Sequence, residues 1–172
     1  MRLKKKLMME KLSSKYVVRR LEHKDIDAIL ALCSKNRLYY EYCPPMVTEK
    51  SIADDLTAFP PNTGIENKNY VGFFDSGKMI AVMDLIDGYP EEKIAFIGFF
   101  MTDVSVQNQG IGSVIIAELA VYLKSMGFQA IRLAWVKGNP QAEHFWIKNG
   151  FEFLKETSST AAECVILAER SL

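Results

Sequence analysis

The feature that most constrains this chain is an apolar segment, Ile94–Thr102, which leads through a turn with two glycines into a helical pattern. The turn reads Val106-Gln107-Asn108-Gln109-Gly110-Ile111-Gly112-Ser113, and apolar residues then recur at helical spacing up to Met126. A strand, a glycine turn and a helix N-terminus in this order direct several unpaired backbone N–H groups to one point. The positive end of the helix dipole adds to their attraction. This turn is therefore predicted to bind a phosphate group.

The rest of the chain predicts a single domain of the mixed α/β (α+β) class over residues 16–172, with no internal repeat and no linker. Patterns of period two indicate strands, and patterns of period 3.6 indicate helices. Helices are predicted to begin at Asp25, Thr48, Ile111 and Asn139. Strands are predicted at Tyr16–Leu21, Asn69–Asp75, Met79–Leu85, Ile94–Thr102, Ala130–Val136, Phe151–Glu156 and Cys164–Ala168. The predicted order is β-α-α-β-β-β-α-β-α-β-β.

Residues 1–15 are predicted to form an N-terminal tail that is solvated or frayed, because chain termini are often poorly ordered. The tail is basic at Arg2 and at Lys4–Lys6, and its apolar run is too short for a signal peptide. No apolar run in the chain reaches the length that spans a membrane, so no membrane partner is expected.

The balance of charges disfavours a nucleic-acid partner, because the chain has 21 basic and 21 acidic side chains. The three cysteines, Cys33, Cys43 and Cys164, are far apart and odd in number. They match neither a metal-binding spacing nor a disulfide framework, and there are only two histidines. No metal is expected, and a reducing, cytoplasmic location is predicted.

Two common phosphate-binding motifs fit the turn poorly. A P-loop needs a lysine followed by a hydroxyl residue after its second glycine, whereas Ser113 follows Gly112 directly. A dinucleotide-binding turn needs a third glycine at the position of Ile115 and an early parallel βαβ unit. Hairpins precede the turn here, so neither nucleotide hydrolysis nor dinucleotide binding is favoured.

A third motif fits better and extends beyond the turn. Gln107-x-x-Gly110-x-Gly112 resembles the Gln/Arg-x-x-Gly-x-Gly/Ala signature of the GNAT (GCN5-related N-acetyltransferase) superfamily. The segment from Asn139 to Phe151 is similar to the second motif of that family, Asn-x-x-Ala-x-x-Phe-Tyr-x-x-x-Gly-Phe. The predicted order of elements also resembles the GNAT fold from the first strand to the last.

The resemblance implies which residues bind acetyl-CoA. The turn would hold its pyrophosphate through backbone N–H groups, with Gly110 and Gly112 allowing close approach. The strands that begin at Ile94 and Ala130 would be parallel neighbours that splay apart around the acetyl group. The implied cofactor residues are Phe100, Met101 and Thr102 beside the pantetheine arm, Gln107, Asn108, Gln109, Gly110, Ile111, Gly112 and Ser113 at the pyrophosphate, and Asn139 and Trp146 near the thioester.

The sequence departs from the family at the positions that usually handle protons. The usual acid is a tyrosine at the position of Trp146, and an indole N–H cannot take that role. Trp146 packs either against the cofactor or in the core. Some members carry a glutamate on the strand before the turn, but Ile94–Thr102 contains no ionisable side chain, and Asp103 is interpreted as a turn residue.

Three acidic residues remain as candidate catalytic groups. Asp84 and Asp87 end the preceding strand, and their spacing predicts that they point to opposite faces of the sheet. Glu41 stands beside Tyr39 and Tyr40, a set that suits a cationic amine substrate through cation–π and charge attraction. An aromatic patch that merely covers the core is the alternative for these tyrosines.

The resemblance thus implies an acetyl-CoA-dependent N-acetyltransferase that transfers the acetyl group directly to a primary amine of a small molecule or a peptide. The alternatives are a non-catalytic acyl-CoA sensor and a transferase of a longer acyl group or one that acts on a hydroxyl. The family also implies the possibility of a homodimer through the last strands.

Overall fold

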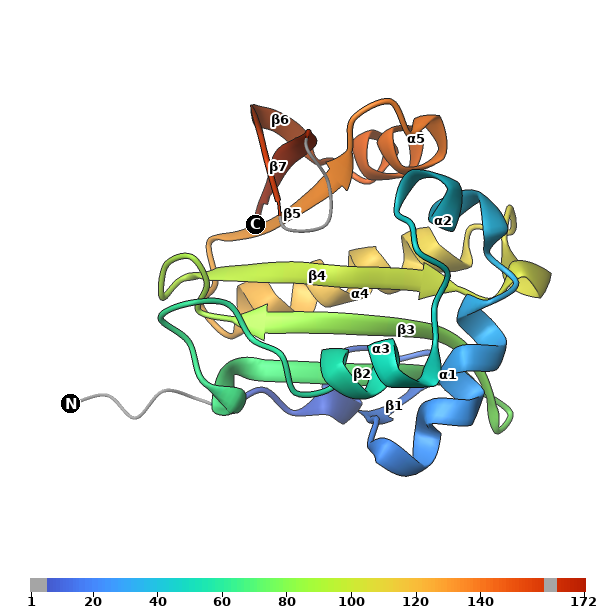
Figure 1. Cartoon of the computed structure of the whole chain (residues 1–172). Coiled ribbons are helices and arrows are strands. Elements are labelled where there is room, and N and C mark those ends of the chain that lie inside the picture. The colour runs from blue at the N-terminus through green and yellow to red at the C-terminus, as the bar shows by residue number, and fades with distance from the viewer. Residues whose placement is uncertain (1–5, 160–163) are drawn as a thin grey trace.

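The computed structural model describes residues 6–159 and 164–172, and a seven-stranded mixed sheet forms its centre (Figure 1). The strand order is β1-β2-β3-β4-β5-β7-β6. All neighbouring strands are antiparallel except β4 and β5, which are parallel. The strands are β1 (Val17–Arg20), β2 (Lys68–Asp75), β3 (Lys78–Asp87), β4 (Ile94–Thr102), β5 (Ala130–Val136), β6 (Glu152–Thr157) and β7 (Val165–Ser171).

Helices cover both faces of this sheet (Figure 1). One apolar cluster lies on the side of α1, α2 and α3, and a second lies on the side of α4 and α5. The α-helices are α1 (Ile26–Cys33), α2 (Arg37–Tyr42), α3 (Glu49–Asp55), α4 (Ile111–Ser125) and α5 (Pro140–Lys148). Short 3-10 turns are η1 (Met9–Lys11), η2 (His23–Asp25), η3 (Ile65–Asn67) and η4 (Val104–Val106).

The predicted mixed sheet is confirmed, but the predicted order lacked one helix. Helix α2 has six residues and ends just before Pro44, so the prolines follow a helix that the sequence pattern did not reveal. None of its residues is fully buried, so it has no apolar stripe of helical period. Contact with the sheet supports it, since the Tyr39 ring meets the Phe99 ring of β4 edge to face at 5.7 Å between centroids.

Strands β4 and β5 part halfway along β4. They pair only from Ile94 opposite Ala130 to Ile97 opposite Leu133. Strand β4 stays paired with β3 on its other side as far as Thr102, and β5 stays paired with β7 as far as Val136. In Figure 1, β5, β6 and β7 accordingly turn away from the plane of β1–β4. The second half of β4 therefore has an edge without a strand partner, as the resemblance implied.

The predicted solvated tail is wrong for residues 6–15, because this segment packs into the main core. Leu7 and Met9 are buried, and Leu12 is fully buried. The backbone N–H of Met8 donates to the Tyr122 hydroxyl of α4 at 2.9 Å. Residues 1–5 lie outside the described residues. Four apolar side chains in a basic segment were too few to indicate burial from the sequence.

Glu118 of α4 fixes the end of the same segment. Its carboxylate accepts from the Ser13 hydroxyl at 2.9 Å and from the Ser14 backbone N–H at 2.6 Å. Burial opposes ionisation of Glu118, but the hydrogen bonds from Ser14 and Ser13 outweigh it and lower the pKa of the carboxyl. The packed domain thus begins well before residue 16.

We predict that Leu12→Ala lowers the free energy of unfolding by about 2–5 kcal/mol, because it leaves a cavity in the core. Met8→Ala is the control in the same segment, since the Met8 side chain is 46% exposed, and it should change stability by roughly 0.5 kcal/mol or less. Urea denaturation measures both values. Equal stability of the two variants would show that residues 6–15 do not pack on the core.

Candidate active site

The turn before α4 leaves a row of backbone N–H groups without acceptors. In the described part of the chain, the backbone amides of residues 108–113 have no hydrogen-bond acceptor. The first bonded amide of α4 is that of Val114, which donates to the Gly110 carbonyl at 3.0 Å. Gly110 is the N-cap of the helix, and no side chain caps it. These amides lie at the positive end of a 15-residue helix, where the helix dipole favours an anion.

Left-handed backbone conformations shape this turn. Asn108 has φ of 59° and Gly110 has φ of 76°. A Cβ added at Gly110 would meet no atom within 4 Å, so glycine is required there by its conformation and not by crowding. Successive left- and right-handed residues form the concave amide arrangement that cradles anions.

Gly112 has a different role from the one that the sequence suggested. A Cβ added there would lie 3.1 Å from the Phe145 ring of α5 and 3.7 Å from the Phe100 ring of β4. The absent side chain therefore lets α4 and α5 pack closely. Ile111 and Ser113, beside it in the first turn of α4, are half-buried.

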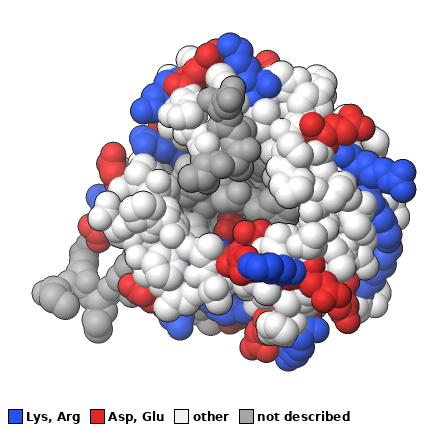
Figure 2. Space-filling view, viewed as in Figure 1, with Lys and Arg blue, Asp and Glu red and all other residues white. Residues whose placement is uncertain are grey.

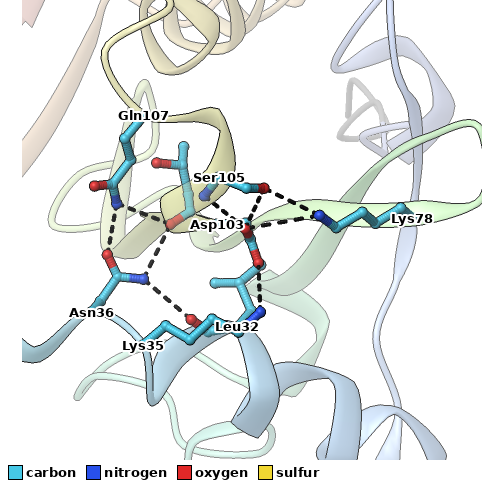
Figure 3. Close-up of polar contacts among 8 residues, drawn as sticks. Leu32, Lys35, Asn36, Lys78, Asp103, Ser105 and Gln107 are labelled. Atoms are coloured by element: carbon cyan, nitrogen blue, oxygen red, sulfur yellow. Dashed lines mark hydrogen bonds and ion pairs between the residues drawn. The ribbon is translucent and has the colours of Figure 1, made fainter.

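Gln107 acts as a brace and not as a free donor to a ligand (Figure 3). Its amide nitrogen donates to the Asn36 side-chain oxygen at 2.7 Å and to the Thr102 carbonyl at 3.2 Å. The Asn36 amide nitrogen in turn donates to the carbonyls of Thr102 and Leu32. The backbone N–H of Gln107 is directed to the Val104 carbonyl. This network joins the turn to the start of α2.

Asp103 supports the same turn from beneath (Figure 3). It is buried, accepts from the backbone N–H and hydroxyl of Ser105, and has Lys35 at 3.5 Å and Lys78 at 3.9 Å. Burial opposes its ionisation, but the bonds from Ser105 and the two lysines outweigh it and lower the pKa of Asp103. The interpretation of Asp103 as a turn residue is confirmed.

Trp146 lies in an aromatic cluster of the core, as one of the two alternatives left by the sequence expects. It is 8% exposed, and its ring packs against Phe145, Phe151 and Phe100 at centroid distances of 4.8, 5.2 and 5.9 Å. The implied contact between Trp146 and the cofactor is not supported by this placement. The cluster instead fixes α5 against the parted half of β4.

Asn139, the other implied residue near the thioester, caps α5. It is buried, and its side-chain oxygen accepts from the Ala142 backbone N–H at 3.2 Å. Among the described residues no acceptor is recorded for its amide nitrogen. The Asn139 side-chain amide lies just after the end of β5, beyond the part of β5 that pairs with β4.

The parted edge of β4 carries the three residues implied for the pantetheine arm. Phe100 and Thr102 are half-buried, whereas the Met101 side chain is buried against α1 and α3. The Thr102 carbonyl is already bonded to Asn36 and Gln107. The backbone from Gly98 to Met101 therefore offers the free edge.

On the facing strand, β5, Trp135 has a buried indole N–H with no partner in the described chain. The sequence did not indicate this feature.

The candidate acceptor side lies on the opposite face, where α1, α2 and α3 cover the sheet. Tyr39 and Tyr40 are half-buried and pack edge to face at 4.9 Å, in the cluster that includes Phe99. Burial raises the pKa of both hydroxyls, so they stay protonated near neutral pH. Glu41, the next residue of α2, is exposed.

Asp84 and Asp87 point to opposite faces, as their spacing predicted. Asp87 is buried and accepts from the side chains of Asn67 and Asn69. Asn69, which donates to Asp87, lies on the same face of β2 as Val71, and Val71 belongs to the apolar cluster beside α4. Asp87 therefore faces away from the candidate acceptor side. Asp84 shares its face with Val82, on the side of α1–α3, and is the one of the two that belongs to the candidate site.

The surface seen from the side of α1–α3 is hollowed near its centre, over β3 and β4, and acidic side chains gather on the rim toward α3 (Figure 2).

Within residues 6–159 and 164–172, no group of three or more His, Cys, Asp or Glu side chains could hold a metal ion. The helices of these residues include none that is long and apolar enough to cross a membrane.

Comparison with known proteins agrees with this geometry. The model of the acetyltransferase (GNAT) family matches residues 35–151, which is more than half of the chain. The chain therefore belongs to the GNAT acetyltransferase family. No curated protein sequence matches it.

Solved structures share the fold at low sequence identity. An acetyltransferase from Thermus thermophilus superposes with a TM-score of 0.76 at 18% identity, with 92% of this chain and 97% of the other covered. The ribosomal-protein-S18-alanine N-acetyltransferase from Escherichia coli has a TM-score of 0.63 at 18% identity, with 91% and 93% covered. The paia N-acetyltransferase from Thermoplasma acidophilum, solved in complex with coenzyme A, has a TM-score of 0.67 at 14% identity, with 91% and 99% covered.

We predict that Asn36 and Gln107 stabilise the protein jointly. A double-mutant cycle with Asn36→Ala and Gln107→Ala should give a coupling energy of about 0.5–3 kcal/mol, because the two side chains share one hydrogen-bond network. Gln109→Ala is the matched control, since Gln109 is an exposed glutamine of the same turn whose one recorded bond is to Ser105. Urea denaturation measures each variant, and strictly additive effects would contradict the proposed brace.

Proposed function

We propose that the protein is an acetyl-CoA-dependent N-acetyltransferase that acts on a primary amine of a small molecule or a peptide. The observation that carries this proposal is the row of unbonded amides at residues 108–113, in a protein that belongs to the GNAT family. A structural relative, the Thermoplasma acidophilum N-acetyltransferase, was solved with coenzyme A, which supports this choice of ligand. A reducing, cytoplasmic location stays a prediction.

In this proposal the turn binds the pyrophosphate and the parted edge of β4 binds the pantetheine arm. The amide-rich arm would pair with the backbone of Gly98–Met101 as an added strand does. The Asn139 amide nitrogen and the Trp135 indole N–H are further unpaired donors on β5 and at its end. Acetyl-CoA supplies the acyl thioester, an acyl donor reactive enough for direct transfer to an amine.

The amine would enter from the side of α1–α3. Tyr39, Tyr40 and Phe99 provide aromatic faces there, and Asp84 provides a carboxylate. Aromatic rings beside a carboxylate favour an ammonium group over a neutral alcohol. An alcohol acceptor and a longer acyl group are the competing substrates, and a non-catalytic acyl-CoA sensor is the competing function.

Transfer is tested by mixing the purified protein with acetyl-CoA and a panel of primary amines that includes polyamines, amino-terminal peptides and lysine peptides. Release of free thiol and the mass of the product report transfer. Amine-dependent thiol release supports the proposal. Tight coenzyme A binding without transfer to any amine would favour the sensor, and transfer from octanoyl-CoA in preference to acetyl-CoA would favour a longer acyl group.

We predict that Gly110→Asp weakens coenzyme A binding by roughly tenfold or more, because a carboxylate at the turn repels the pyrophosphate. Gly127→Asp is a matched control at the other end of α4. Both glycines have positive φ, 76° and 95°, and both have open space where a Cβ would lie. The two variants should therefore suffer similar backbone strain.

Isothermal titration with coenzyme A measures the affinities, and thermal melting confirms that both variants are folded. The Gly127 variant should bind as the parent protein does. If the Gly110 variant also binds with unchanged affinity, the pyrophosphate does not occupy this turn.

A further inference from the structure

Asp84 lies at a point of the sheet where the backbone is irregular. Asp84 pairs with Phe99 and Leu85 pairs with Ile97, so Gly98 of β4 has no partner on β3. This bulge follows directly after the last residue pair that joins β4 to β5, Ile97 and Leu133. The carboxylate of Asp84 therefore stands beside the residue at which β4 and β5 part.

Gly98 leaves the space that this carboxylate occupies. A Cβ at Gly98 would lie 3.2 Å from the Asp84 Oδ2 atom, closer than ordinary contacts allow. Gly98 itself is exposed, although it belongs to a central strand. Bulges of this kind re-aim side chains next to active sites.

A buried lysine holds Asp84 by one oxygen only. The Lys68 Nζ atom lies 2.7 Å from Asp84 Oδ2, and the two side chains are 3% and 16% exposed. The other carboxylate oxygen, Oδ1, is buried and has no hydrogen-bond partner in the described chain. Buried polar atoms are nearly always bonded, so this unbonded carboxylate oxygen beside the candidate site leaves a place for a donor from a ligand.

Lys68 of β2 and Asp55 of α3 act directly on this carboxylate. Tyr70 of β2 interacts with Asp84 and also with Asp55, Tyr40 of α2 and Cys33 of α1. Burial raises the pKa of Asp84, Lys68 opposes this rise, and Asp55 adds to it. The hydroxyls of Tyr40 and Tyr70 and the Cys33 thiol also have raised pKa values because they are buried, so Lys68 supplies the positive charge of this cluster.

We propose that Asp84 is the general base of the acetyl transfer and that Lys68 positions it, so that Oδ1 is presented to the ammonium group of the acceptor. The proposal rests on the proposed function. It assigns the base to β3, because β4 carries no ionisable side chain and Asp87 points to the opposite face of the sheet.

The proton balance of the step is complete with the groups named. Asp84 Oδ1 accepts one proton from the ammonium form of the amine. The C–N bond then forms as the thioester C–S bond breaks, and the second proton of the amine nitrogen goes to the departing thiolate. The Asp84 carboxyl returns its proton to solvent, so each turnover releases one amide, one thiol and one proton.

Asp84→Asn tests the base, because asparagine keeps the shape of the side chain and cannot accept this proton. We expect kcat/KM for the amine to fall by roughly 10²–10⁴-fold, with coenzyme A affinity changed by about twofold or less. Asp87→Asn is the matched control: it removes a buried carboxylate from the same strand on the opposite face and should leave kcat/KM within about threefold of the parent. Equal activity of the two variants, both folded by circular dichroism, would overturn the proposal.

Lys68→Met tests the positioning role through the pH profile of kcat/KM. Lys68 lowers the pKa of Asp84, so its removal should raise that pKa. A base must be deprotonated to act, so the acidic limb of the profile should move to higher pH. Lys68→Arg keeps the charge and should restore the limb toward that of the parent protein. A residue that only supported the fold would lower the rate without moving the limb, and an unmoved limb in a folded Lys68→Met variant would reject the role.

The two proposals fail in different ways. If the parent protein transfers acetyl to no amine, the proposed function fails before any variant is compared. If the parent protein acetylates an amine and Asp84→Asn does so at the parent rate with the parent pH profile, the assignment of the base fails while the function stands.

Discussion

The whole site depends on the parting of β4 from β5 after Ile97 and Leu133. Backbone N–H and C=O groups at a strand edge need partners, so two parallel neighbours that separate must be stabilised from elsewhere. On the face of α4 and α5, the rings of Phe100, Phe145 and Trp146 pack together, and Gly112 allows that approach. At the far end of β4, Asn36 and Gln107 bond the last carbonyl. The edge between these two supports stays free for a ligand.

The features that were predicted from the sequence are those encoded over short distances. Strand β4 and strand β5 have the predicted bounds, and α4 begins at the predicted residue, because apolar period and glycine position act within one element. The glycine turn before α4 belongs to the same class, although the positive φ of Gly110 was not predicted. The face of Asp84 relative to Asp87 also followed from strand geometry alone.

The features that were not predicted depend on partners distant in the chain. Helix α2 is supported by a ring of β4, and residues 6–15 are held by Glu118 and Tyr122 of α4, more than 100 residues away. Gln107 matched a cofactor motif, yet its side chain bonds Asn36, 71 positions away. The pairing of Asp84 with Lys68 has no local signal either, because it depends on the register of β2 against β3. Patterns within a segment carry no information about such contacts.

The two faces of the sheet have separate chemical roles, and this separation explains the tryptophan at position 146. On the face of α4 and α5, the residues near the site are aromatic and buried, and Trp146 completes their packing. Titratable groups gather on the other face, where Lys68 contacts Asp84 and the Tyr70 ring, and Tyr70 interacts with Tyr40. In the proposed mechanism Asp84 takes one proton from the amine and the second amine proton goes to the departing thiolate, so no titratable group is needed at position 146. Burial also keeps the tyrosine hydroxyls of that face protonated, as any group that donates a proton to a departing thiolate must be.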